Sequence, residues 1–359
     1  MDKEPEMQAT NGSDAVICAR ERETPAGASP LKRDDASQVL KDAKALGKFY
    51  TPASVARLAS RLIVDFFADD LTNKKIYDPT CGSGFLLHDL ASQLEAPVHA
   101  YGQDVDEKSV EMAKSNLLGS KNVRSINYGV GDTLLAPHFM NERFDAITAN
   151  PPFSLKWDSS KVAADDPRFS NTLAPNKASD LAFLQHGLHL LDKDGCASFI
   201  MFPGVCYRVG REQAIREKIL PNLNAVVSLP ERLFNETSIG VVLMFLTKEP
   251  NESVLFVDAT GVETKKDGAA LALTKESIDL IVKTVRDRRN VEYFARFVDH
   301  AEIRANKCNF TPSLYVEKKD GREKIDIDEL ERQIAIIVEK NAENRRRLDE
   351  LVKSLKDYR

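Results

Sequence analysis

The sequence predicts an α/β protein in which helices cover both faces of a doubly wound, mostly parallel sheet, followed by a C-terminal helical arm. Two observations carry this prediction. Short apolar runs of strand length alternate with amphipathic segments from about residue 51 to residue 288, and apolar residues near the C-terminus recur at heptad spacing. Such alternation is typical of parallel sheets, because each crossover between parallel strands needs a long connection that is usually a helix.

The expected strands are apolar runs bounded by turn residues. They are residues 75–78, 98–104, 124–130, 144–149, 197–202, 225–229, 241–247 and 254–257. Helical spacing of apolar residues predicts helices at residues 51–67, 85–94, 107–118, 179–191, 211–220 and 275–288. We expect the first helix to begin at Thr51 as the N-cap, with Pro52 at the first helical position.

The two ends of the chain differ from this alternating segment. Residues 1–38 are polar and lack an apolar period, which predicts a flexible arm. Residues 39–260 are expected to form the main domain, residues 261–323 an extension of it, and residues 324–359 a long helix. The heptad seam of that helix runs from Leu330 to Leu355 and includes Asn341 and Asn344, with Asp328 as its candidate cap. A helix docked on its own domain is one explanation, but its length and polar flanks favour contact with a partner.

Composition limits the choice of partners and ligands. The net charge of −5 argues against tight unaided binding of a polyanion. The five cysteines include no CxxC pair, and His186 and His189 have no third ligand nearby, so we expect reduced thiols and no metal. No apolar run is long enough for a membrane helix and no leader sequence is evident, so the protein is expected in the cytoplasm.

A glycine-rich turn follows the first strand of the sheet, at Asp78-Pro79-Thr80-Cys81-Gly82-Ser83-Gly84. Glycines let a ligand approach the backbone, and the following helix offers free N–H groups. The turn lacks the patterns of dinucleotide and phosphate loops, which favours a ligand with little or no phosphate. An ordinary tight turn is the alternative interpretation.

Acidic residues end or follow the next two strands. Asp104 lies twenty residues beyond Gly84, the offset at which doubly wound sheets place a carboxylate on ribose hydroxyls. Together with the glycine turn, it predicts a site for an adenosyl nucleoside. Asp132 is a candidate for the edge of the adenine, and a turn-forming role for it is an equal alternative.

The candidate catalytic segment is Asn150-Pro151-Pro152-Phe153, after the fourth strand. The amino group of a nucleobase is a poor nucleophile because its lone pair is delocalised into the ring. The Asn150 side-chain oxygen and the Pro151 carbonyl can accept its two N–H bonds and aim the lone pair at a sulfonium methyl group. The prolines stiffen the turn, and Phe153 offers a face on which an extruded base can stack, worth roughly 1–3 kcal/mol.

With these motifs the chain resembles the modification (methyltransferase) subunits of type I restriction-modification systems, within the N6-adenine DNA methyltransferases. The resemblance runs from about Gly47 to the C-terminus. Its motifs, in order, are Phe49-Tyr50-Thr51-Pro52, Asp78 to Gly84, Gly102-Gln103-Asp104, Asn150 to Phe153, Asp166-Pro167-Arg168-Phe169, Lys177 to Phe183, Phe202-Pro203-Gly204-Val205, Val227 to Pro230, and Asn306 to Tyr315. Single motifs are weak, but this many in the same order are specific.

The resemblance implies a seven-stranded class I methyltransferase fold, which is Rossmann-like, with residues 39–260 as the methyltransferase domain. It implies S-adenosyl-L-methionine as cofactor. Gly82, Ser83 and Gly84 would line its methionine end, in the same turn as Asp78 and Thr80, and Asp104, in place of the family's commoner glutamate, would hold the ribose. The segment implied to close over the cofactor is Lys48, Phe49, Tyr50, Thr51, Pro52 and Ala53.

The implied activity is site-specific methylation of N6 of adenine in double-stranded DNA. The implied partners are a specificity subunit, a second modification subunit contacted through the C-terminal helix, and sometimes a restriction subunit. The family usually has a helical domain ahead of the FTP motif, whereas this sequence has a short polar segment there, so we expect partners to help hold the DNA. Open alternatives are methylation of N4 of cytosine, methylation of a protein glutamine amide, which poses the same lone-pair problem, and a non-catalytic assembly role.

Overall fold

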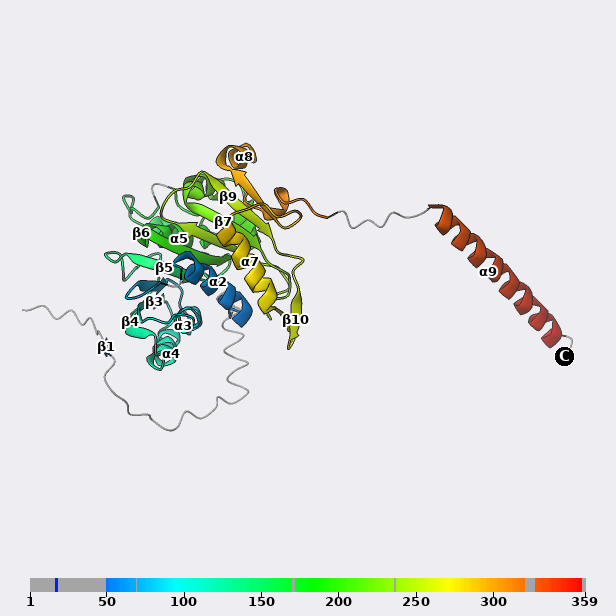
Figure 1. Ribbon diagram of the computed structural model, residues 1–359, viewed down its shortest axis with the longest axis horizontal. Helices are drawn as coiled ribbons and strands as arrows, with labels where there is room; N and C mark the ends of the chain where they lie inside the picture. The colour runs from blue at the N-terminus through cyan, green and yellow to red at the C-terminus, as the bar shows by residue number, and fades with distance from the viewer. Residues whose placement is uncertain are drawn as a thin grey trace, which may run out of the picture. The chain divides into compact units, whose positions relative to one another are not determined.

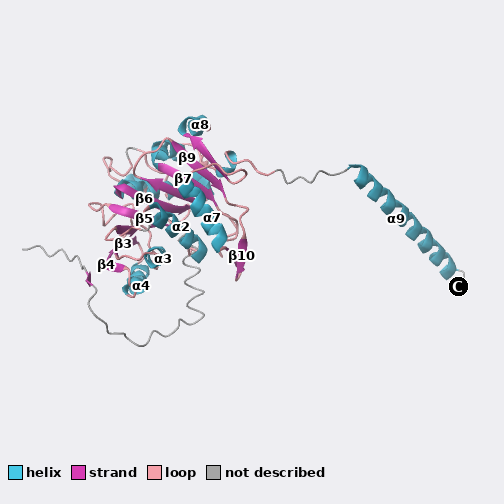
Figure 2. Ribbon diagram, viewed as in Figure 1, coloured by secondary structure: helices cyan, strands magenta, loops and turns pink. Residues whose placement is uncertain are grey.

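The computed structural model describes residues 17–18, 50–68, 70–169, 172–235, 237–319 and 327–356. The chain divides into two compact units, Met1–Glu317 and Lys318–Arg359, which are described separately. The first unit is a sheet enclosed by helices, and the second contains one long helix (Figures 1 and 2). Apart from two residues, the predicted N-terminal arm lies outside the described residues.

The sheet of the first unit has ten strands in the order β1-β4-β3-β2-β5-β6-β8-β7-β9-β12. They are β1 (Ile17–Cys18), β2 (Lys75–Asp78), β3 (Val98–Asp104), β4 (Val123–Val130), β5 (Phe144–Ala149), β6 (Leu191–Met201), β7 (Leu223–Ser228), β8 (Val242–Thr247), β9 (Ser253–Asp258) and β12 (Ala295–Asp299). Strands β4, β3, β2, β5 and β6 are mutually parallel, and β8 is antiparallel to both of its neighbours. The predicted doubly wound, mostly parallel α/β sheet is confirmed.

The strand count differs from the seven that the family resemblance implies. Seven consecutive strands, from β4 to β7 in the sheet order, form the expected set, and β1, β9 and β12 extend it at the two edges. Strand β12 belongs to the segment predicted as a C-terminal extension, and it pairs with β9 in the main sheet. A separate hairpin, β10 (Thr264–Asp267) with β11 (Ala270–Leu273), was not predicted.

Helices cover both faces of the sheet because alternate residues of each strand point to opposite sides. In β7, Ala225 and Val227 join one core and Val226 joins the other. The first core is completed by α2 (Ala53–Phe66), α3 (Phe85–Ser92), α4 (Glu107–Leu118) and α7 (Lys275–Asp287). The second core contains α5 (Asp180–Leu190), α6 (Arg211–Ile219) and α8 (His300–Ala305). Helices α2 and α7 lie side by side (Figure 1).

The start of the first helix differs from the prediction. Helix α2 begins at Ala53, and Pro52, with φ −61° and ψ 144°, is its N-cap without a side-chain hydrogen bond. The expectation that Thr51 caps this helix is therefore wrong. The Thr51 hydroxyl instead accepts a hydrogen bond from Asn150, a residue of the candidate site. Local spacing does not reveal this contact, because the two residues are far apart in sequence.

The long helix of the second unit is α9 (Ile327–Lys356). It begins before Asp328, so that residue lies in the first turn and is not its cap. The apolar residues of the predicted seam are exposed at the positions whose side chains are described, namely Leu330, Ile334, Ile337, Leu348 and Leu351. Among the described helices of the whole chain, none combines the length and the hydropathy that crossing a membrane requires.

Candidate functional site

Four predicted site segments meet at one edge of the sheet. Strands β4, β3, β2 and β5 are adjacent and parallel, so the loops that follow them leave from the same edge. These loops carry Asp132, Asp104, the turn from Asp78 to Gly84, and Asn150 to Phe153. In open α/β sheets, ligands bind outside the carboxyl ends of the strands.

The turn after β2 is held by the Asp78 carboxylate. Asp78 Oδ1 accepts hydrogen bonds from the Thr80 backbone N–H at 2.8 Å and from the Thr80 hydroxyl at 3.4 Å. Burial raises the pKa of Asp78 to about 8, although the Thr80 N–H opposes that rise. The Thr80 contacts therefore fix the buried Asp78 carboxyl group at the start of the turn.

The two glycines of the turn play different parts. Gly82 has φ +50°, and a Cβ built on it would meet nothing within 4 Å, so this side of the turn is open to a ligand. Gly84 has φ +76°, and a Cβ there would lie 2.9 Å from the Ala113 Cβ of α4. Glycine at 84 is therefore explained by the close packing of α3 on α4, and its contact with a cofactor stays a prediction. The Ser83 carbonyl accepts a hydrogen bond from Asn116 at 2.9 Å.

Asp104 joins the end of β3 to the glycine turn. One carboxylate oxygen accepts the Gly82 N–H at 2.9 Å, and the other accepts the Asp106 N–H at 3.0 Å. These two contacts fix the Asp104 carboxylate beside the glycine turn, at the carboxyl end of β3. The structure brings Asp104 and Gly82 together as the sequence predicts.

The loop after β4 is shaped by Asp132 and by Gln103. Asp132 accepts the backbone N–H groups of Leu134 at 2.8 Å and Leu135 at 3.2 Å, which is the turn-forming arrangement. The buried Gln103 amide donates to the carbonyls of Gly131 and Ala136, at 3.1 and 3.0 Å. The sequence analysis named Gln103 only as part of a family motif and assigned it no role. In the structure its side chain braces this loop.

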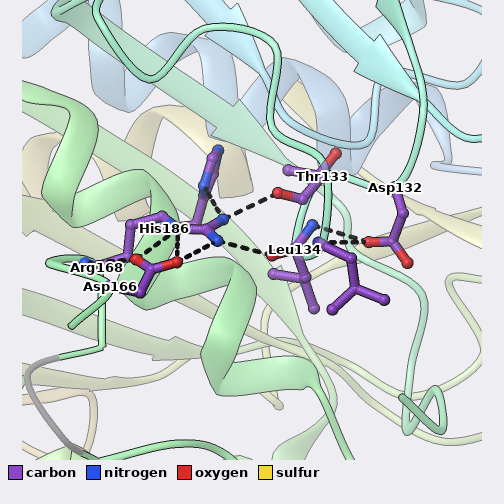
Figure 3. Close-up of polar contacts among 7 residues, drawn as sticks. Asp132, Thr133, Leu134, Asp166, Arg168 and His186 are labelled. Carbon is purple, nitrogen blue, oxygen red and sulfur yellow. Dashed lines mark hydrogen bonds and ion pairs between the residues drawn. The ribbon is translucent and has the colours of Figure 1, made fainter. Parts of the chain in front are cut away.

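A second brace of the same loop is Arg168, which the sequence named only as part of a family motif (Figure 3). Its guanidinium donates to the carbonyls of Thr133 at 3.0 Å and Leu134 at 2.7 Å. It also pairs with Asp166 at 2.7 Å, and its side chain is only 3% exposed. A guanidinium presents several donors in one plane, so a single residue holds two consecutive carbonyls of the loop.

His186 completes this buried cluster, and both of its ring nitrogens lie in polar contacts. Arg168 Nη1 lies 3.2 Å from His186 Nδ1, and because arginine only donates, Nδ1 accepts. Nε2 then carries the proton and lies 3.2 Å from the Tyr77 hydroxyl. Burial and the neighbouring Arg168 charge lower the pKa of His186 to about 3, so the ring is neutral at physiological pH.

The candidate catalytic segment contacts the segment predicted to cover the cofactor. Asn150 Nδ2 donates to the Thr51 hydroxyl at 3.0 Å, across 99 residues of sequence. Tyr50 and Ala53, on either side, are exposed, whereas Thr51 and Pro52 are half-buried. Lys48 and Phe49, also predicted for this segment, lie outside the described residues.

Phe153 is held among other aromatic rings. Its centroid lies 6.2 Å from that of Phe234 in an edge-on arrangement and 6.3 Å from that of Phe202 in a tilted one. These distances fall within the range of favourable aromatic pairs. Phe234 follows β7, far away in sequence, so no local pattern could assign it to this site.

The turn after Phe153 is fixed by a buried acid. Ser154 has φ +51°, a left-handed conformation that costs a non-glycine residue energy, and its N–H donates to Asp180 at 3.0 Å. Asp180 is the first residue of α5 and is buried, and this burial raises its pKa. Arg208 Nη2 donates to the Ser154 hydroxyl at 3.2 Å. The sequence quoted Asp180 within a family motif but gave it no role.

This sheet, with a glycine turn after β2 and Asn-Pro-Pro-Phe after β5, defines the class I S-adenosylmethionine-dependent methyltransferase fold, which solved structures of that class share. The chain belongs to the N-6 DNA Methylase family, whose model matches residues 37–324. This confirms the resemblance that the sequence motifs indicated.

Within that family, the chain is similar to methylase subunits of type I restriction enzymes. The chain is 30% identical to the type I restriction enzyme MpnII methylase subunit of Mycoplasma pneumoniae, over 87% of this chain and 61% of that protein. It is 31% identical to the MjaVII methylase subunit of Methanocaldococcus jannaschii, over 78% and 51%. The type I restriction-modification methyltransferase subunit of Streptococcus thermophilus superposes with a TM-score of 0.71 at 30% identity, over 79% and 63%. The chain thus spans about half to three-fifths of these curated relatives' length.

Proposed function

We propose that this chain is a modification subunit of a type I restriction-modification system, which transfers the methyl group of S-adenosylmethionine to N6 of adenine in DNA. The observation that carries the proposal is the placement of Asn150 to Phe153 beside the glycine turn, at the shared edge of β5 and β2. The family and the similar type I methylase subunits support the same function.

The residues present fit an adenosyl cofactor. Gly82 leaves open space where a side chain would stand, and Asp104 lies against it with a carboxylate suited to ribose hydroxyls. Ser83 would share the methionine end, Asp132 would edge the adenine, and residues 48–53 would cover the site. When bound, the cofactor supplies an electrophilic methyl group on a sulfonium.

The protein's part in the reaction is to prepare the nucleophile. The Asn150 side-chain oxygen and the Pro151 carbonyl accept the two N–H bonds of the adenine amino group, which localises the nitrogen lone pair. The hydrogen bond from Asn150 Nδ2 to the Thr51 hydroxyl fixes the orientation of the Asn150 side-chain amide, with its nitrogen towards Thr51. Phe153 stacks on the extruded base, and its aromatic neighbours keep its ring in place.

The proposed partners are double-stranded DNA, a DNA specificity subunit and a second modification subunit, with a restriction subunit in some assemblies. Support comes from α9, whose described seam is exposed along the helix. An apolar seam with asparagine positions suits a helical partner and fixes its register. We place the assembly in the cytoplasm, where its DNA substrate is.

Base-resolved methylation mapping tests this function. DNA from cells that carry the chain with its neighbouring genes should contain N6-methyladenine at a recurring sequence, and DNA from cells with Asn150→Ala should not. Methylation at N4 of cytosine would change the acceptor. Labelled methyl found in protein and in no DNA would replace the proposal with glutamine methylation, and cofactor binding without any transfer would support an assembly role.

A further inference from the structure

Residues 207–210 form a loop that lies against the candidate catalytic turn. The loop joins a short 3-10 helix, η2 (Pro203–Cys206), to α6. Its Arg208 donates to the Ser154 hydroxyl at 3.2 Å and lies over the Phe202 ring at 5.6 Å. Phe202 in turn neighbours Phe153. Arg208 therefore reaches the catalytic segment by two routes, one polar and one aromatic.

Arg208 is held loosely by its acidic neighbours. Its Nη1 lies 3.4 Å from a Glu212 oxygen and 3.9 Å from an Asp180 oxygen. Charge-assisted bonds are typically about 2.7–2.9 Å long, so both contacts are stretched. The Arg208 side chain is 29% exposed, whereas those of Asp180 and Glu212 are 2% and 4% exposed. A guanidinium has five N–H donors, and the described structure offers this one three acceptors, so donors remain for an external anion.

The surroundings of Arg208 suit nucleic acid. Tyr207 is 53% exposed and Val209 is 77% exposed, so a phenol and an apolar side chain flank the cation at the surface. Arg211, at the start of α6, is exposed as well. Cationic groups neutralise phosphates, and aromatic rings pack on sugars and bases. The chain has a net charge of −5, so the position of a cation directly beside the catalytic turn does not follow from an overall positive charge.

We propose that Arg208 binds the phosphodiester next to the extruded nucleotide, and that residues 207–210 form a DNA-contact loop coupled to the catalytic turn through Ser154. This inference rests on the proposed function. A phosphate accepts two parallel N–H bonds from a guanidinium, which the stretched contacts to Glu212 and Asp180 do not provide. The Ser154 N–H bond to Asp180 keeps the turn anchored while the arginine changes partners.

Salt-dependent DNA binding tests the phosphate contact. The measurement uses the purified assembly of the chain with the products of its neighbouring genes, because the net charge of −5 argues against tight unaided DNA binding. The affinity of this assembly for a DNA duplex is measured by fluorescence anisotropy at several salt concentrations. Loss of one phosphate contact in Arg208→Gln should make the slope of log affinity against log salt shallower by about one. The matched control is Arg286→Gln, which removes another surface arginine, paired with Asp65 at 3.0 Å near the far end of α2, and should leave the slope unchanged.

The outcomes separate the two proposals. Equal slopes for wild type and Arg208→Gln, equal losses in both variants, or no salt-dependent binding by the wild type would overturn the phosphate contact. Arg208→Lys keeps the charge and should keep the slope, and cofactor titration of each variant shows that it is folded. A wild type that binds DNA through Arg208 but methylates none refutes only the proposed function. Methylation of DNA with an unchanged KM for DNA in Arg208→Gln refutes only this inference.

Discussion

Two arginines hold the two sides of the candidate site in different ways. Arg168, on the proposed cofactor side, is 3% exposed and bonds two loop carbonyls and Asp166 at 2.7–3.2 Å. Arg208, on the target side, is 29% exposed, and its contacts range from 3.2 to 3.9 Å. The first guanidinium is satisfied inside the protein, and the second has donors to spare.

The difference follows from what each side must do. A buried charge is tolerated only when its partners are complete, so Arg168 fixes the loop after β4 in one conformation. Arg208 is partly exposed and its contacts with Asp180 and Glu212 are long, so an anion can compete with them for its N–H donors. The proposed cofactor side is therefore pre-organised, whereas the proposed target side contains a cation with longer and partly exposed contacts.

The largest effect is expected from Arg168→Met. The substitution leaves the partly buried Asp166 carboxylate and two carbonyls without their shared donor, which should cost about 2–4 kcal/mol. Urea denaturation measures the loss of unfolding free energy. Arg286→Met, at an exposed ion pair, should lose at most about 1 kcal/mol. Similar values for both would show that the Arg168 cluster is not a brace.

Asn150→Ala should affect mainly the proposed target side. Loss of the acceptor for the amino group should lower kcat by about 10²–10³-fold, as for other single polar groups that act in the transition state. Cofactor affinity should fall much less, because the variant loses only the Thr51 contact of the proposed covering segment, whereas the glycine turn and Asp104 follow other strands. Asp104→Ala should instead weaken cofactor binding. Titration calorimetry on both variants decides the matter, and equal cofactor loss in both would refute these roles.

The two glycines of the turn should respond differently to alanine. Gly84→Ala adds left-handed strain and a 2.9 Å approach to Ala113, together worth about 2–4 kcal/mol of stability. Gly82→Ala has only the strain of its positive φ, about 1–2 kcal/mol, but it fills open space proposed for the cofactor. Thermal unfolding and cofactor titration of both variants test this. Only for Gly82→Ala do we expect the loss of cofactor-binding free energy to exceed the loss of unfolding free energy.

The last effect concerns pH. The folded-state pKa of His186 is about 3 against an ordinary 6.5, so the folded protein resists protonation that the unfolded chain accepts. The stability from this group is present above pH 6.5 and is lost as pH falls toward 3, with about 2 kcal/mol lost by pH 5. Urea denaturation at pH 7 and pH 5 measures it. His186→Gln should flatten this dependence, and an unchanged slope would mean that the ring titrates normally.

The sequence by itself determined the order and nature of most elements. Strands β2, β3 and β5 and helix α4 have the bounds that apolar runs and turn residues predict. Local patterns are sufficient there because burial on two faces imposes a continuous apolar run, and one-sided burial imposes a helical period. Local sequence also predicted three candidate site segments, namely the glycine turn, Asp104 and the segment that begins at Asn150. Each could be recognised because its chemical groups come from residues adjacent in sequence.

The tertiary structure decided which distant residues support that chemistry. Thr51 bonds Asn150 and caps no helix, Asp180 anchors Ser154, and Arg168 holds the loop after β4. Strand β12 went unpredicted because it is a short edge strand with a half-exposed pattern that resembles a loop. These contacts join segments separated by 26 to 99 residues, so their partners depend on the packing of the sheet and not on local spacing.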